Sequence, residues 1–81
     1  MASAVVHIRL HGDVNTVTHA TADLTAFLYR AHIDATPTAP GELLASLAYP
    51  VDRTARAELE FALRAWQHDW PDVTFRISVH G

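Results

Sequence analysis

The stretch VVHIRLH, residues 5–11, decides the fold of this chain because its apolar and polar side chains alternate. Val6, Ile8 and Leu10 take every second position, and the positions between them hold histidine or arginine. A period of two is typical of a β-strand with one buried and one exposed face. The same alternation returns in residues 73–80 at the other end of the chain. The two ends therefore predict one sheet whose open face is basic and rich in imidazole.

Two segments with helical periodicity lie between these strands. Apolar residues recur at helical spacing over residues 14–32, directly after Asp13, a residue type that caps helix N-termini. A second and clearer helical pattern covers residues 53–70, with Asp52 as its candidate cap, and Pro71 ends it. We expect the apolar stripe of this second helix to pack under the sheet. Its members are Ala55, Leu59, Ala62, Leu63, Trp66 and Trp70.

The middle segment, residues 33–50, allows two interpretations. Pro37 and Pro40-Gly41 exclude a continuous helix. A hairpin would have an edge strand over residues 33–38, a turn at the second proline and another strand over residues 42–49. The second half of the segment could instead form a helical turn, since Glu, Leu and Ala favour helix. We favour the hairpin because it completes the sheet that the two terminal strands require.

The predicted element order is β-α-β-β-α-β within a single domain, residues 1–81. This order resembles the ferredoxin-like fold. The resemblance implies an α+β two-layer sandwich, in which a four-stranded antiparallel sheet of order 4-1-3-2 carries both helices on one face. The first strand would then be central and would pair with the last. Because unrelated enzymes, RNA binders and ligand sensors share this fold, the resemblance assigns no function.

The composition limits the classes of function. Cysteine is absent, which excludes disulfides, thiol nucleophiles and cysteine-based zinc sites. The net charge of −3 argues against non-specific binding to nucleic acid or to an anionic membrane. No apolar run reaches the roughly 20 residues of a membrane span, and no secretory signal is evident, so we expect a cytoplasmic protein. All 6 basic residues are arginine, a usage that indicates a GC-rich genome and a small bacterial protein.

The predicted pairing of the two end strands gathers a candidate binding surface on the open face. Arg9 falls opposite or diagonal to Arg76, and like charges opposed on a sheet are unfavourable by up to ~1 kcal/mol. Guanidinium groups bind anions through paired hydrogen bonds, so a ligand or a partner's carboxylate could bridge the two. Glu42 on the neighbouring strand could also neutralise them. The candidate surface consists of His7, Arg9, His11, Arg76, Ser78 and His80.

Metal, cofactor and catalytic sites are not expected. His7 and His11 are four residues apart in a strand, or ~13 Å, which is too far to share an ion. His7 and His80 could be cross-strand neighbours, but a third ligand is not evident. His19 and Asp23, one helical turn apart, could chelate only weakly. The chain has neither a glycine-rich phosphate loop nor a nucleophile motif.

A second candidate surface lies on the outer sides of the two helices. Phe61 is a large aromatic residue opposite the apolar stripe of its helix. Such a residue is either covered by a loop or another molecule, or is an ordinary single exposed aromatic. The first helix is rich in small residues on its outer side. This candidate helix-side interface consists of Phe61, Arg64, His68, Ala22, Ala26 and Tyr29.

These features predict a small non-catalytic interaction or regulatory module. It would bind a protein partner, or itself as a homodimer, through the open face of the sheet. One alternative is that the same face recognises an anionic ligand, a nucleotide or a short nucleic acid, with nucleic acid disfavoured by the net charge. Another alternative is a small enzyme that uses histidine as an acid or base. A membrane is not an expected partner.

Overall fold

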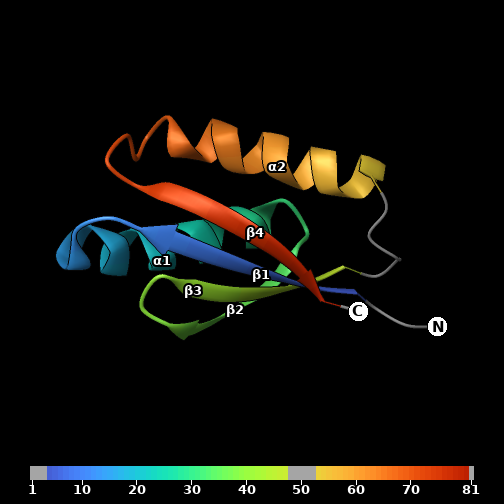
Figure 1. The fold of residues 1–81 in the computed structure, drawn as a ribbon, viewed down its shortest axis with the longest axis horizontal. Coiled ribbons are helices and arrows are strands. Elements are labelled where there is room, and N and C mark those ends of the chain that lie inside the picture. The colour runs from blue at the N-terminus through green and yellow to red at the C-terminus, as the bar shows by residue number, and fades with distance from the viewer. Residues whose placement is uncertain (1–3, 48–52, 81) are drawn as a thin grey trace.

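A computed structural model of the chain describes residues 4–47 and 53–80 (Figure 1). The predicted element order is confirmed, with the bounds β1 (Ala4–His11), α1 (Val14–Arg30), β2 (Asp34–Ala39), β3 (Glu42–Leu47), α2 (Arg53–Gln67) and β4 (Thr74–His80). The strands form one antiparallel sheet of order β2-β3-β1-β4. This is the predicted order 4-1-3-2 read from the other edge, and it is consistent with the ferredoxin-like topology.

The hairpin interpretation of the middle segment is confirmed for its described part. Leu43, Ala45 and Leu47 of β3 are buried, whereas Leu44 and Ser46 between them are exposed. This alternation is typical of a strand and excludes the helical turn. The remainder of the predicted strand, residues 48–49, and the candidate cap Asp52 lie outside the described residues, as do the side chains of Ala55 and His80.

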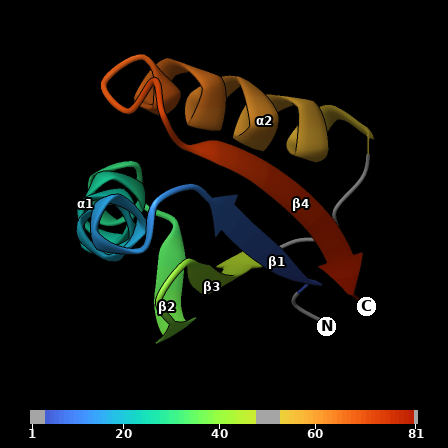
Figure 2. The ribbon, with the colours of Figure 1, turned by 60° about the vertical axis from the view of Figure 1, so that its left-hand side comes forward.

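The hydrophobic core lies between the helices and one face of the sheet. Side chains of β1 and β3 at alternate positions are fully or almost fully buried, and α1 and α2 add their apolar stripes to the same cluster. Helix α1 lies mainly against the β2 side of the sheet, and α2 lies along β4 (Figure 2). Trp66 is 3% exposed and Trp70 is partly buried, so the predicted role of both as packing residues is confirmed.

Helix α1 begins as predicted and ends two residues earlier than predicted. The carboxylate of Asp13 accepts hydrogen bonds from two backbone N–H groups of the first turn, at 3.2 and 3.4 Å, and so caps the helix. The helix ends at Arg30 because His32 adopts a left-handed conformation with φ 63°. The backbone N–H of His32 donates to the carbonyl of Tyr29 (3.0 Å), and that of Ile33 donates to the carbonyl of Leu28 (2.8 Å). These bonds close the helix end, at which the left-handed position is usually occupied by glycine.

Helix α2 ends at Gln67 rather than at residue 70. The next residues turn more tightly, because Asp69 and Trp70 donate to backbone carbonyls three residues earlier, at 3.1 and 2.8 Å. The side-chain amide of Gln67 donates to the carbonyl of Val73 across this turn. The helical periodicity therefore continues in the sequence beyond the point at which the helix itself stops.

Candidate functional site

The open face of the sheet is formed by the side chains that alternate with the core residues. On β1 these positions are Val5, His7, Arg9 and His11, on β3 they are Glu42, Leu44 and Ser46, and on β4 they are Thr74, Arg76 and Ser78. Most of these residues are exposed, whereas their neighbours in the strands of β1 and β3 are buried. The sheet therefore presents a polar surface whose residues come from distant parts of the chain.

The pairing of β1 with β4 brings most of the expected site residues into one row. Arg9 is directly opposite Arg76, which is one of the two arrangements expected from the sequence. His7 is opposite Ser78, and His11 is opposite Thr74. The position of His80 is opposite Val5, so His80 is a diagonal and not a direct neighbour of His7. The two arginines thus mark the centre of the candidate site.

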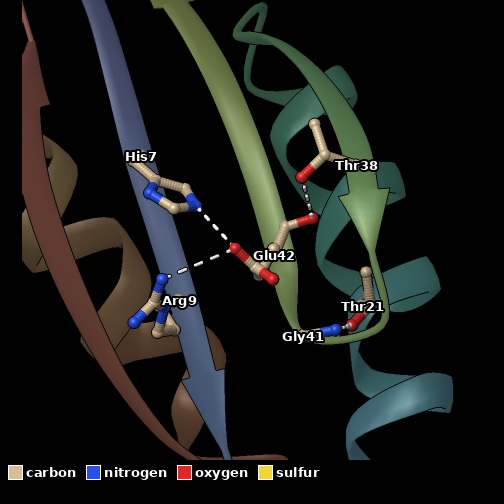
Figure 3. Close-up of polar contacts among 6 residues, drawn as sticks. All are labelled: His7, Arg9, Thr21, Thr38, Gly41 and Glu42. Carbon is tan, nitrogen blue, oxygen red and sulfur yellow. Dashed lines mark hydrogen bonds and ion pairs between the residues drawn. The ribbon is translucent and has the colours of Figure 1, made fainter.

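Glu42 supplies a carboxylate to this site from the neighbouring strand. Its Oε1 lies 3.2 Å from Nε2 of His7 and 3.6 Å from a guanidinium nitrogen of Arg9 (Figure 3). Arg9 is opposite Glu42 in the register of β1 with β3, which explains the approach. The side chains of Glu42 and Arg9 are 37% and 54% exposed, so water weakens their attraction.

The position of Glu42 is fixed by contacts that reach into the core. Gly41 directly precedes it in the turn and has a φ of 84°, a conformation that favours glycine. The carbonyl of Gly41 accepts from the N–H of Leu10 at 2.7 Å, and the N–H of Gly41 donates to Oγ1 of Thr21 at 2.8 Å (Figure 3). Thr21 is 5% exposed and belongs to α1. The helix therefore positions the turn that carries the site's carboxylate.

Arg76 has no matching carboxylate among the described residues. The ion pairs within residues 4–47 and 53–80 join Glu42 to His7 and Arg9, and Glu60 to Arg64. The carboxylate of Glu42 thus lies close to both Arg9 and His7. Arg76, which is opposite Arg9 in the sheet, is exposed to solvent. The site keeps a surplus of positive charge that can attract an anion.

The histidines do not gather into a metal centre. Among the described residues, no group of three or more His, Asp or Glu side chains has a geometry that could hold an ion. His19 and Asp23, which could chelate an ion only weakly, each make other contacts. Nδ1 of His19 lies 2.9 Å from the backbone carbonyl oxygen of Asn15, and Asp23 accepts hydrogen bonds from Trp66 and Trp70.

Those hydrogen bonds to Asp23 form a link between the helices that the sequence did not indicate. Oδ2 of Asp23 accepts from the indole N–H groups of Trp66 (2.9 Å) and Trp70 (3.0 Å). The two indole rings are stacked, with centroids 6.1 Å apart. A carboxylate on α1 thus satisfies Trp66 of α2 and Trp70 in the turn that follows it, and the sequence gives no signal for partners 43 and 47 residues away.

The residues of the candidate helix-side interface are exposed, some on α1 and the others on or just after α2. Phe61 is 77% exposed and lies beside Arg64 in a depression of about 260 Å³. Tyr29 on α1 is 78% exposed, and Ala22 and Ala26 on the same helix are also exposed. No hydrogen bond, ion pair or ring contact of the described residues joins the two groups. His68 is exposed in a further depression beside Arg64.

A further depression on the described surface was not expected from the sequence. It has a volume of about 450 Å³ and lies where α1 meets β2. Its lining consists of Tyr29, Arg30, His32, Ile33 and Asp34. The left-handed His32 creates this junction, because it turns the chain from the helix into the edge strand.

Two further results bear on the class of protein. Within residues 4–47 and 53–80, neither helix combines the length and apolar character that crossing a bilayer requires. A comparison with protein-family models and with curated proteins found no match to this chain.

Proposed function

We propose that this domain is a non-catalytic interaction module whose open sheet face binds a carboxylate-bearing segment of a protein partner. The observation that carries the proposal is the direct opposition of Arg9 and Arg76, with Glu42 as the one carboxylate beside them among the described residues. Directly opposed like charges on a sheet are unfavourable by about 0.2–1 kcal/mol. A carboxylate between the two guanidinium groups removes this repulsion and forms charge-assisted hydrogen bonds with both.

The architecture supports the proposal. We take the domain to be a two-layer sandwich whose helices both cover the other face, in line with a core cluster that contains residues of both helices. The open face is then available to a partner across its full width. The overall charge of −3 disfavours nucleic acid as that partner, whereas a local carboxylate needs only the arginine pair. The proposal keeps the cytoplasmic location expected from the sequence.

The test is a set of titrations of the ¹⁵N-labelled protein, followed by NMR. The probes are a glutamate-rich peptide, inorganic phosphate and a short single-stranded oligonucleotide. We expect the peptide to shift the amide signals of β1 and β4, and we expect binding to weaken with added salt. Arg76→Ala should reduce the affinity for the peptide by about tenfold, which corresponds to about 1.4 kcal/mol.

The matched control is Arg64→Ala, because Arg64 is an exposed arginine on α2 that pairs with Glu60. This variant should bind the peptide like the unaltered protein. Equal binding by the Arg76→Ala variant and the unaltered protein would overturn the proposal, as would an absence of shifts on the open face. Tighter binding of the oligonucleotide or of phosphate than of the peptide would replace a protein partner by an anionic ligand.

A further inference from the structure

The two edges of the sheet differ in their capacity to accept another strand. At the β2 edge, Pro37 lacks an N–H group, and the pairing with β3 shifts between Pro37 and Ala39. Proline and irregular pairing are the usual means by which an edge strand is protected from further pairing. At the opposite edge, β4 runs without interruption over Thr74–His80 and contains no proline. The edge at β4 is therefore the one that can pair.

The outer side of β4 is unpaired within the described part of the chain. β4 is the last strand of the sheet, and its one strand partner is β1. In an antiparallel ladder, alternate residues direct their backbone N–H and C=O groups toward each neighbour. Apart from the ladder with β1, no backbone hydrogen bond from another described segment reaches residues 74–80. This leaves a row of donors and acceptors that a second strand can satisfy.

The side chains of β4 that face the helices are also incompletely covered. Phe75 and Ile77 are partly buried, and Val79 is 40% exposed. Their partners on β1 are far better buried, since Val6 and Ile8 are both 0% exposed. The apolar layer under the sheet thus ends in half-covered side chains at this edge, and a further strand would extend that layer.

We propose that β4 pairs with β4 of a second copy of this chain. The strands run antiparallel across a two-fold axis perpendicular to the sheet, and the two sheets join into one. The interface is isologous, so each copy contributes the same seven residues. This inference does not depend on the proposed function of the open face, because the edge and the face are different surfaces.

The sequence of β4 selects the register of this pairing. Opposed residues of an antiparallel pair point to the same side of the sheet, so the axis must pass beside a residue and not between two successive ones. Centring on Ile77 pairs all seven residues, and it places Phe75 opposite Val79 of the second copy. Arg76 then lies opposite Ser78 of the second copy. Centring on Arg76 would oppose the two copies of that arginine and leave part of the strand unpaired.

The first test is the oligomeric state, measured by sedimentation equilibrium over a concentration series. The variant is Val79→Lys, because a charge at the edge opposes strand addition. The matched control is Leu44→Lys, since Leu44 is also a strand residue and is 39% exposed, but lies on the internal strand β3. We expect the unaltered protein to dimerise, Val79→Lys to weaken the dimer by about tenfold or more, and Leu44→Lys to leave it unchanged.

A strictly monomeric protein at the highest concentrations would overturn the inference. So would a dimer that dissociates in Leu44→Lys but persists in Val79→Lys, because that result would move the interface to the open face. Neither result depends on whether a glutamate-rich peptide binds, so failure here is separate from failure of the proposed function.

The register has its own test, which the absence of native cysteine makes clean. Arg76→Cys and Ser78→Cys variants are mixed and oxidised, and we expect the mixed disulfide to exceed the disulfide that either variant forms alone. The reason is that a disulfide requires Cβ atoms about 3.5–4.5 Å apart, and directly opposed strand residues, at about 4.5–5.5 Å, come much nearer to this than diagonal ones. Equal or greater cross-linking of either variant with itself would overturn the register.

Discussion

The two faces of the sheet are built from the same strands, yet they differ in what holds their residues in place. On the covered face, Ile8 is 0% exposed and packs within a single apolar cluster. One residue further along β1, Arg9 is exposed and lies between a carboxylate and a second arginine. Burial of apolar area stabilises the first face, and weak, screened electrostatics act on the second. Successive residues of one strand therefore differ in role: one is held by the core, and the next belongs to an exposed, charged surface.

The largest effect on the free energy of unfolding should come from removing apolar volume on the covered face. Ile8→Ala should lower the free energy of unfolding by about 2–5 kcal/mol, because it loses buried surface and leaves a cavity. Arg9→Ala, its neighbour in the strand, should change that free energy by less than about 0.5 kcal/mol. Urea denaturation followed by circular dichroism measures both. Comparable losses in the two variants would contradict the separation of the two faces.

A second substitution acts on the one described hydrogen bond that ties α1 to the turn before Glu42. Thr21→Val keeps the size of the side chain but leaves the N–H of Gly41 without its acceptor, at an expected cost of about 1–3 kcal/mol. The control is Thr18→Val, because the exposed Thr18 hydroxyl donates to the carbonyl of Val14 at 2.8 Å, just as that of Thr21 donates to Val17 at 2.7 Å. Thr18→Val should be nearly neutral in urea denaturation. A neutral Thr21→Val would show that the turn does not need the helix.

The link between the helices gives a third, smaller expected effect. Asp23→Ala removes the acceptor of both indole N–H groups and should cost about 1–2 kcal/mol, with solvent compensating the more exposed Trp70. Asp23→Asn is the control, since its side-chain carbonyl oxygen can still accept hydrogen bonds although it carries no charge, and it should lose less. Thermal unfolding by calorimetry ranks the two variants. The opposite ranking would show that the carboxylate is not the acceptor that matters.

At the end of α1, a substitution should raise the free energy of unfolding instead of lowering it. His32→Gly relieves a left-handed conformation that glycine adopts readily, and we expect a gain of about 0.5–1 kcal/mol. His32→Ala is the comparison, because alanine retains the strain of a Cβ atom and should bring no such gain. The midpoint of urea denaturation measures both. A loss of stability with glycine would mean that the imidazole makes a compensating contribution.

The smallest effect is expected on the open face itself. Arg76→Thr removes one of two opposed charges and should stabilise the domain by a few tenths of a kcal/mol at low salt. Because salt screens exposed charges, the gain should shrink as the ionic strength rises. Denaturation at two salt concentrations measures the difference. A destabilised variant at low salt would indicate that Arg76 has an attractive partner in the folded domain.

The sequence predicted those parts of the molecule that depend on local pattern. The alternation of apolar and polar residues predicted β1 and β4, the helical periodicity predicted α1 and α2, and the proline-glycine turn predicted the hairpin. The opposition of Arg9 and Arg76 followed from the element order, because the fold dictates which strands are neighbours. Glu42 was also expected beside them, since it begins the adjacent strand.

The unpredicted features all depend on how distant side chains meet in space. The acceptor of both tryptophans is Asp23, which has an ordinary position on a helix and could not be told from a solvated carboxylate. The bond from Gly41 to Thr21 joins residues whose proximity depends on the packing of α1 against the hairpin. The conformation of His32 escaped prediction because glycine, the usual signal for such a helix end, is absent there.

The shared acceptor of the two indoles has a practical consequence for optical experiments on this domain. The chain contains 2 tryptophans, and the indole N–H groups of both donate hydrogen bonds to Asp23. Its tryptophan emission therefore comes from one locality, beside the hydrophobic core and not on the open face that carries Arg9. That emission will register disturbance of the interhelical junction, and a ligand seated over the arginines will require a dye or an isotope label to be seen.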